Sequence, residues 1–256
     1  MDNTVALVTG AAGGIGIAIS RALGQRGSTV AAVDREPGAL RDAVDKLNAD
    51  GLHVEAFPTD VSNSAEVEGT VAAVEHGMGP LDFLVNAAGV LRLGEARSLT
   101  DEDWETTFAV NVNGVFHMSR AAVNRMIPRE RGAIVTVTSN AAGTPRTEMA
   151  AYGASKAAAT MFTKSLGLEV ARYGIRCNVV APGSTATPML RSMWQDESGE
   201  QATIKGIPEA YKVGIPLGKI ARPSDVAEAV VFLLSSEAGH ITLHALTVDG
   251  GASLGS

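Results

Sequence analysis

Three features are scarce in this chain of 256 residues: cysteine, basic charge and long apolar runs. Cys177 is the single cysteine, which excludes an internal disulfide and fits a reducing compartment. The formal charge of −7 argues against nucleic-acid binding, because that function needs a basic surface. No apolar run approaches the roughly 18 residues of a membrane span, and the opening residues lack the basic and apolar regions of a signal peptide. We therefore expect a cytoplasmic protein that binds neither nucleic acid nor a membrane.

Short apolar runs alternate with longer amphipathic stretches from one end of the sequence to the other. The apolar runs predict strands, and their near-continuous apolar character is typical of a parallel sheet that is covered on both faces. The expected strands are Thr4–Thr9, Thr29–Asp34, His53–Phe57, Leu81–Asn86, Gly132–Ser139, Ile175–Ala181 and Leu243–Val248. The expected helices are Gly14–Arg26, Pro37–Asn48, Thr100–Ile127, Ala150–Tyr173 and Pro223–Ser235, and one more that Ser62 or Asn63 can cap and that runs to about His76. The alternation predicts an α/β, doubly wound, Rossmann-type fold in a single domain over residues 1–256.

One segment, residues 183–214, interrupts this alternation after the sixth predicted strand. It is long and rich in methionine and acidic residues. A long excursion at the carboxyl end of a strand is usually a binding loop or lid, and a disordered surface insertion is the alternative. Met189, Met193 and Trp194 are candidates for an apolar lid over a substrate ring. The same three side chains could instead pack within the lid or against another subunit.

The stretch Tyr152-Gly-Ala-Ser-Lys156, with Ser139 thirteen residues before it, gives the strongest indication of chemistry. On a helix, Tyr152 and Lys156 share a face. A cation held close to a phenol favours the phenolate and lowers the tyrosine pKa from about 10 toward neutrality. A shift of about three pH units needs roughly 4 kcal/mol, which a desolvated site supplies and an exposed pair does not. We predict that Tyr152 takes a proton from a substrate alcohol as a general base, and a helix that merely happens to carry Tyr and Lys is the alternative.

A glycine-rich turn follows the first predicted strand, and an acidic residue ends the second. The turn reads Gly10-Ala-Ala-Gly13-Gly14-Ile15-Gly16, so its backbone amides can approach a pyrophosphate at a helix N-terminus. Asp34 can accept hydrogen bonds from the ribose hydroxyls and would repel a 2′-phosphate. Arg35 is the contrary residue, because an arginine there could bind that phosphate. We predict NAD rather than NADP as the cofactor.

Two further segments lie at strand ends, where a dinucleotide would be bound. Asp60-Val61 follows the third predicted strand, and Asn86-Ala87-Ala88-Gly89 ends the fourth. Small residues in the second segment permit close approach to the adenosine half of the cofactor. Without the glycine turn and Asp34, tight turn geometry would be the preferred interpretation of both segments.

Taken together, these motifs resemble those of short-chain dehydrogenases and reductases over essentially the whole chain. The matching residues are Thr9, Gly10, Gly14, Ile15, Gly16, Asn86, Ala87, Ala88, Gly89, Asn111, Ser139, Tyr152, Lys156, Pro182 and Gly183. The resemblance implies a catalytic tetrad of Asn111, Ser139, Tyr152 and Lys156. It further implies a sheet of seven parallel strands, commonly a homotetramer, a contact of Lys156 with the nicotinamide ribose, and a water held by Asn111. Thr185 and Thr187, beyond Pro182-Gly183, are expected to meet the nicotinamide carboxamide.

A closer resemblance, best from about residue 81 onward, is to members of this family that oxidise carboxylated cyclohexadiene diols. The segments that carry it are Ala87–Gly94, Trp104–Val112, Thr144–Arg146, Ile175–Val180, Gly214–Pro223 and His240–Leu243. It implies NAD-dependent formation of an aromatic catechol acid for siderophores. Asn140 and Ala186–Pro188 depart from that pattern near the substrate, so the 2-amino analogue, which gives 3-hydroxyanthranilate, is a close alternative. A 3-oxoacyl or other ketone reductase, usually NADPH-linked, and a catalytically silent NAD-sensing protein are more distant ones.

A carboxylated substrate needs a cation in the site. Arg146, on the loop after Ser139, and Arg92, after the fourth predicted strand, are candidates for a bidentate clamp. A simply solvated arginine is the alternative for both. The five histidines are scattered, so we expect no metal site. Cys177 lies within a predicted buried strand and is interpreted as a packing residue rather than a nucleophile.

Overall fold

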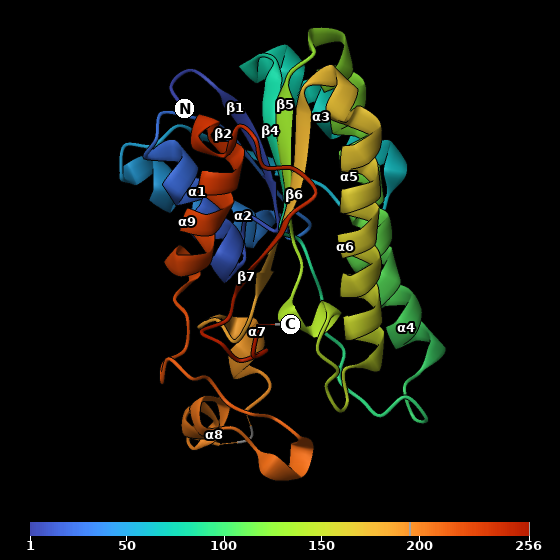
Figure 1. Cartoon of the computed structure of the whole chain (residues 1–256). Helices are drawn as coiled ribbons and strands as arrows, with labels where there is room; N and C mark the ends of the chain where they lie inside the picture. The colour runs from blue at the N-terminus through green and yellow to red at the C-terminus, as the bar shows by residue number, and fades with distance from the viewer. Residues whose placement is uncertain (195, 256) are drawn as a thin grey trace.

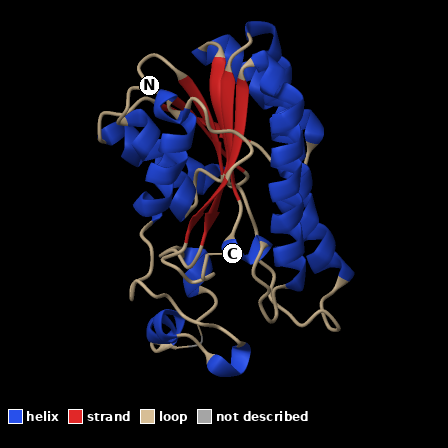
Figure 2. Ribbon diagram, in the orientation of Figure 1, coloured by secondary structure: helices blue, strands red, loops and turns tan. Residues whose placement is uncertain are grey.

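The computed structural model describes residues 1–194 and 196–255. These residues form one sheet of seven parallel strands in the order β3-β2-β1-β4-β5-β6-β7, with helices on both faces (Figure 1, Figure 2). The strands are β1 (Val5–Thr9), β2 (Thr29–Asp34), β3 (Val54–Pro58), β4 (Leu81–Asn86), β5 (Gly132–Val137), β6 (Ile175–Pro182) and β7 (Ala245–Val248). The predicted doubly wound α/β fold is therefore confirmed, with shifts of a few residues at the strand ends.

The helices divide between the two faces of the sheet, and each face packs into its own apolar core (Figure 1). One face is covered by α1 (Gly14–Gly24), α2 (Pro37–Ala49) and α9 (Pro223–Leu234), and the other by α3 (Ser64–Met78), α5 (Val115–Met126) and α6 (Ala150–Val170). Ile19 and Leu23 are fully buried in the first core, as is Met118 in the second. Each such side chain stabilises the fold by roughly 1.5–3 kcal/mol. In the described part of the chain, no helix is long and apolar enough to cross a membrane.

The order of the strands reverses between β1 and β4, which both lie at the centre of the sheet. β1 pairs with β2 on one side and with β4 on the other. Ligand crevices of doubly wound sheets open at this point, beyond the carboxyl ends of the strands. Thr9, the last residue of β1, joins the two halves, because its Oγ1 accepts hydrogen bonds from the amides of Ala87 and Ala88, both at 3.0 Å. The glycine turn is thereby held beside the segment that follows β4.

The single helix predicted over Thr100–Ile127 is divided in the structure. A first helix, α4 (Asp101–Phe108), passes into a π-helical turn at Ala109–Gly114 before α5 begins. Asn111 lies inside this turn and directs its side chain to the backbone of Val90. Its Oδ1 accepts from Val90 N at 2.9 Å, and its Nδ2 donates to Val90 O at 3.0 Å. Such single π turns within helices often mark functional sites.

The segment of residues 183–214, called the lid from here on, lies beyond the carboxyl end of β6. It contains α7 (Pro188–Arg191), α8 (Gly199–Lys205) and a 3₁₀ turn at Pro208–Ala210. Figure 1 shows α7 and α8 past the end of the sheet, apart from the helices that cover its faces. Gly206 and Gly214 have φ values of +88° and +90°, so the return of the lid depends on glycine. The described part of the lid therefore contains regular secondary structure in the form of short helices.

Candidate active site

The glycine turn between β1 and α1 lines a first cavity of about 300 Å³. Gly10 has a φ of +68°, and a Cβ there would lie 2.8 Å from Ala87 O. A Cβ on Gly16 would overlap the carbonyl oxygen of Gly10. Both positions require glycine, because a side chain would push the turn away from its neighbours. The first turn of α1 contains no acidic residue, which leaves the helix N-terminus available to an anion.

Asp34, at the end of β2, holds the glycine turn and borders the same cavity. Its Oδ2 accepts from Ala12 N at 3.0 Å, and its Oδ1 accepts from Glu36 N at 3.2 Å. Arg35, the residue that could favour a 2′-phosphate, is exposed and forms an ion pair with Glu36 at 3.2 Å. Its charge is therefore partly neutralised by its own neighbour.

Most residues predicted to bind the cofactor line this first cavity. They are Gly10, Gly13, Gly14, Ile15, Gly16, Asp34, Arg35, Asp60, Val61, Ala87, Ala88, Gly89 and Thr187. Asn86 instead lies buried beneath, where its Nδ2 donates to Ser119 Oγ at 3.0 Å, and its Oδ1 has no partner among the described residues. A cradle closed by glycines at a helix N-terminus fits the pyrophosphate of a dinucleotide. The residues present therefore fit a dinucleotide cofactor.

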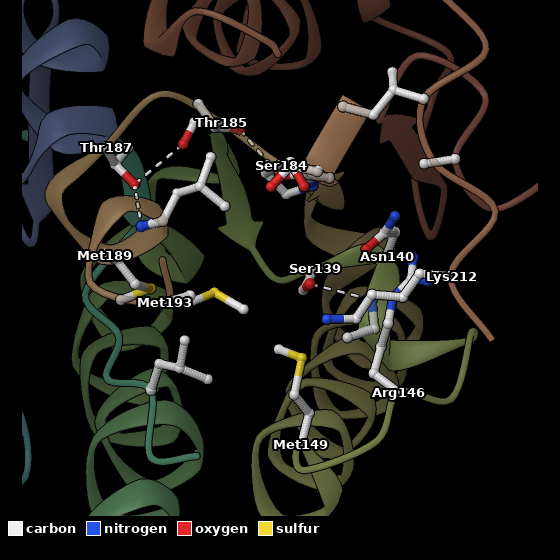
Figure 3. Close-up of a pocket in the computed structure, with 18 of the residues that line it drawn as sticks. Ser139, Asn140, Arg146, Met149, Ser184, Thr185, Thr187, Met189, Met193 and Lys212 are labelled. Atoms are coloured by element: carbon white, nitrogen blue, oxygen red, sulfur yellow. Dashed lines mark hydrogen bonds between the residues drawn. The ribbon is translucent and has the colours of Figure 1, made fainter. Parts of the chain in front are cut away.

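A second cavity, of about 450 Å³, continues from the first. Ile15, Thr187 and Met189 line both cavities. Among the predicted residues, the second cavity is also lined by Ser139, Arg146, Tyr152, Pro182, Gly183, Thr185, Met193 and Trp194. Figure 3 shows Ser139 between the methionines of the lid on one side and Arg146 on the other. The hydroxyl of Thr138 also lies here, buried and without a partner among the described residues.

Tyr152 and Lys156 lie one turn apart on α6, and Lys156 Nζ is 5.6 Å from the centroid of the Tyr152 ring. Burial raises the pKa of Tyr152 to about 12, although its hydrogen bond with Ser139 lowers that pKa by a smaller amount. Burial also lowers the pKa of Lys156 to about 8. The prediction that Lys156 brings the Tyr152 pKa toward neutrality is therefore wrong for the chain by itself. The loss of water destabilises the phenolate more than the groups around it stabilise it.

Asn111 and Lys156 meet around Gly89. A Cβ on Gly89 would lie 3.2 Å from Lys156 Nζ and 3.3 Å from Asn111 Oδ1. Lys156 Nζ donates to Val137 O at 3.2 Å, and Asn111 Nδ2 donates to Ser155 Oγ at 3.0 Å. The structure thus brings Asn111 and Lys156 together around Gly89, with Lys156 beside Tyr152 and Tyr152 hydrogen-bonded to Ser139, so the four residues of the predicted tetrad lie close to one another.

The two arginines considered for a substrate carboxylate lie in different places. Arg146 lines the second cavity. Arg92 does not belong to its described lining, and its Nε lies 3.4 Å from Asp103 Oδ1. Trp194 fits two of the interpretations given for the lid. It lines the cavity, as expected of an apolar cover over a substrate ring, and it packs within the lid, where its Nε1 donates to Thr203 Oγ1 at 3.1 Å.

Several residues of the second cavity escaped the sequence reasoning. They include Met149, Ser184, Ile207 and Lys212. Met149 could have been found, because it lies three residues before Tyr152, directly ahead of the helix that carries Tyr152. Lys212 has no such signal, since it lies in the lid outside any motif or periodic pattern.

Cys177 is buried in β6, and burial raises the pKa of its thiol to about 12. Its side chain is fully buried in the second apolar core, in agreement with its interpretation as a packing residue. Among residues 1–194 and 196–255, no three His, Cys, Asp or Glu side chains gather in a way that could hold a metal ion.

The chain belongs to the short chain dehydrogenase family, because the family model of that description matches residues 4–198. A 2,3-dihydro-2,3-dihydroxybenzoate dehydrogenase of Bacillus subtilis (strain 168) is 57% identical over 100% of this chain and 98% of its own length. Its namesake from Escherichia coli (strain K12) is 44% identical over 97% of this chain and 96% of its own length. Among solved structures, an actinorhodin polyketide ketoreductase with NADPH has a TM-score of 0.90 and 37% identity, covering 98% of this chain and 97% of that one. The family expected from the sequence motifs is confirmed, and the protein is an oxidoreductase of that family.

Proposed function

We propose that this protein is an NAD-dependent dehydrogenase that oxidises 2,3-dihydro-2,3-dihydroxybenzoate to 2,3-dihydroxybenzoate, a catechol acid of siderophore biosynthesis. The second cavity carries the proposal, because it combines the pair Ser139 and Tyr152 with the cation Arg146 in a space of about 450 Å³. A small ring that bears both a hydroxyl and a carboxylate suits such a cavity. Similarity to dehydrogenases of this name over the full chain supports the same substrate.

We infer NAD rather than NADP from the position of Asp34. Two amides fix its carboxylate at the edge of the first cavity, where a ribose would lie. At a separation of about 5 Å and an effective dielectric constant of about 20, two like charges repel by roughly 3 kcal/mol. Arg35 offsets this repulsion poorly, because Glu36 already pairs with it. The NADPH named for the solved ketoreductase belongs to that protein.

The proposed reaction removes a hydride and a proton from C3 and its hydroxyl. NAD⁺, when bound, would supply the hydride acceptor and, until the hydride is transferred, a positive charge near the phenol. Tyr152 Oη takes the hydroxyl proton, while Ser139 Oγ, its hydrogen-bond partner, orients the same substrate oxygen. Lys156, when protonated, favours the phenolate from its place beside the ring. The ring ketone left behind tautomerises to the aromatic acid, which favours oxidation.

The proton leaves Tyr152 by way of Lys156 and a water held at Asn111, in the same proposal. The two side chains lie together around Gly89. A pKa of about 8 lets the amine of Lys156 release and regain a proton close to neutral pH. This arrangement supports the role that the family resemblance implies for Asn111.

We also propose that the protein works as a homotetramer in the cytoplasm and binds small molecules rather than nucleic acid or membranes. Neighbouring helices α4, α5 and α6 expose the apolar side chains of Trp104 (45%), Phe116 (38%) and Met161 (63%). Large exposed apolar residues on adjacent helices favour a subunit contact. The measurement is the mass of the purified protein in solution, and a monomer at micromolar concentration contradicts the tetramer.

The function is tested by NADH formation with three substrates: the dihydrodiol acid, its 2-amino analogue and a 3-hydroxyacyl thioester. We expect the highest kcat/KM for the dihydrodiol acid with NAD, and 2,3-dihydroxybenzoate as the product identified by chromatography. Faster turnover of the amino analogue would assign the alternative aromatic acid. Turnover of the thioester alone, with NADP as the preferred cofactor, would contradict the proposal.

A further inference from the structure

Two cationic side chains from distant parts of the sequence line the second cavity. Arg146 comes from the loop that precedes α6, whereas Lys212 comes from the lid. Both side chains are partly buried. Figure 3 places both on the side of Asn140, with Ser139 between them and the lid methionines. One end of the cavity is therefore cationic and the opposite end is apolar.

Neither cation has a counter-ion in the part of the chain that the structure describes. The ion pairs of the described residues involve neither Arg146 nor Lys212. Asp196 is the acidic side chain in the described lining, and it forms no ion pair with either cation; its Oδ1 accepts from Ser198 N at 2.7 Å. A chain with a formal charge of −7 thus places in one cavity two cations that form no ion pair with a described residue. Partial burial of like charges is unfavourable until an anion joins them.

The backbone that carries Lys212 is fixed by its own hydrogen bonds. Ile207 N donates to Lys212 O at 2.9 Å, and Lys212 N donates to Ile207 O at 3.0 Å. A Cβ on Gly206 would overlap Lys212 O, so the close approach of the two chain segments depends on that glycine. Because the base of the side chain is held in place, less freedom is lost when its amine binds an anion.

We propose that Lys212 binds the substrate carboxylate together with Arg146, so that recognition of the acid is divided between the lid and the body of the protein. The guanidinium of Arg146 supplies a planar fork, and Lys212 adds a compact charge from the lid. The ring then packs toward Met193 with its C3 hydroxyl near Ser139. Lys212 is a specificity-determining residue in this arrangement, because an uncharged diol does not connect the lid to the loop. The inference rests on the proposed function, since it takes a carboxylated ring as the substrate.

The kinetic test compares Lys212→Gln with Lys212→Arg, and with Lys205→Gln as the matched control. Lys205 is an exposed lysine of the same lid that is absent from the described lining of the cavity. Lys212→Gln is expected to raise KM for the dihydrodiol acid by roughly 10-fold to 100-fold, the range of a charge-assisted contact. KM for the cyclohexadiene diol without the carboxylate, and KM for NAD, should change by less than about twofold. Lys212→Arg should restore most of the affinity, and Lys205→Gln should behave as the wild type.

A binding measurement separates this inference from the proposed function. Isothermal titration calorimetry of the NAD-loaded protein with 2,3-dihydroxybenzoate, and with benzoate, does not depend on turnover. A matching loss of affinity in Lys212→Gln supports the carboxylate site, even if another acid proves to be the substrate. If the wild type binds these acids and Lys212→Gln binds them equally well, the inference fails and the proposed function stands. If the wild type neither binds nor oxidises any of the acids, both fail.

Discussion

Replacing Lys156 with methionine is expected to stabilise the protein while abolishing its activity. Lys156 is 5% exposed, and burial lowers its pKa from 10.5 to about 8. Each pH unit of that difference corresponds to about 1.36 kcal/mol, so keeping the amine protonated near neutral pH destabilises the folded state by roughly 3 kcal/mol. Loss of the hydrogen bond to Val137 O, 3.2 Å long, offsets about 1–2 kcal/mol of this gain. The net gain in free energy of unfolding is therefore about 1–2 kcal/mol.

The pH dependence of this gain distinguishes a buried charge from better packing. Because the folded-state pKa is lowered, the unfolded chain keeps between pH 8 and 10.5 a proton that the folded chain has released. The free energy of unfolding of the wild type therefore rises with pH across that window. The difference in free energy of unfolding between Lys156→Met and the wild type shrinks accordingly. Tyr152 acts in the opposite sense from pH 10 to about 12, so the measurement stops near pH 10.

The assay is urea unfolding of both proteins at several pH values between neutrality and pH 10, without cofactor. Lys164→Met is the matched control, because Lys164 lies on the same helix and is only partly buried. We expect no more than a few tenths of a kcal/mol from this control. A Lys156→Met variant that is no more stable than the wild type at neutral pH would refute the reasoning. So would a difference that stays constant as the pH rises.

Two other substitutions test the cofactor site. Asp34→Ser should raise the ratio of kcat/KM for NADP to kcat/KM for NAD by roughly 100-fold, which corresponds to about 3 kcal/mol. Initial rates with both dinucleotides measure this ratio. An unchanged ratio would show that Asp34 does not select the cofactor. Gly16→Ala should eliminate NAD binding in calorimetry and lower the melting temperature, because the new Cβ overlaps Gly10 O. Gly38→Ala is its control, since a Cβ there meets nothing within 4 Å, and normal NAD binding by Gly16→Ala would contradict the tight-turn argument.

The fold could be predicted because its local signals agree with its packing. The strands are short apolar runs that the sheet buries, and helix starts carry recognisable residues. Asn63, one of the two candidate caps, accepts from Ala65 N at 3.0 Å at the start of α3, and Pro37 begins α2. The π turn around Asn111 could not be predicted, because it depends on a contact with Val90, far away in the sequence.

The sequence predicted which residues form the candidate site, but it did not predict their pKa values. Spacing alone places Tyr152 and Lys156 on one helix face, and the structure agrees. How far each pKa moves depends on how deeply the fold buries the two groups, which the spacing does not reveal. Lys212 shows the same limit, since its place in the second cavity is set by the path of the lid rather than by any motif.

The transfer of a proton to Tyr152 is tested most directly by single-turnover NADH formation in Tyr152→Phe, with saturating NAD and the dihydrodiol acid. Phenylalanine keeps the ring beside Lys156 and removes the hydroxyl that takes the proton. We expect the rate to fall by roughly 10²-fold to 10⁴-fold, while the dissociation constant of NAD changes by less than about twofold. NADH formation at the wild-type rate by this variant would contradict the role of Tyr152 as the base.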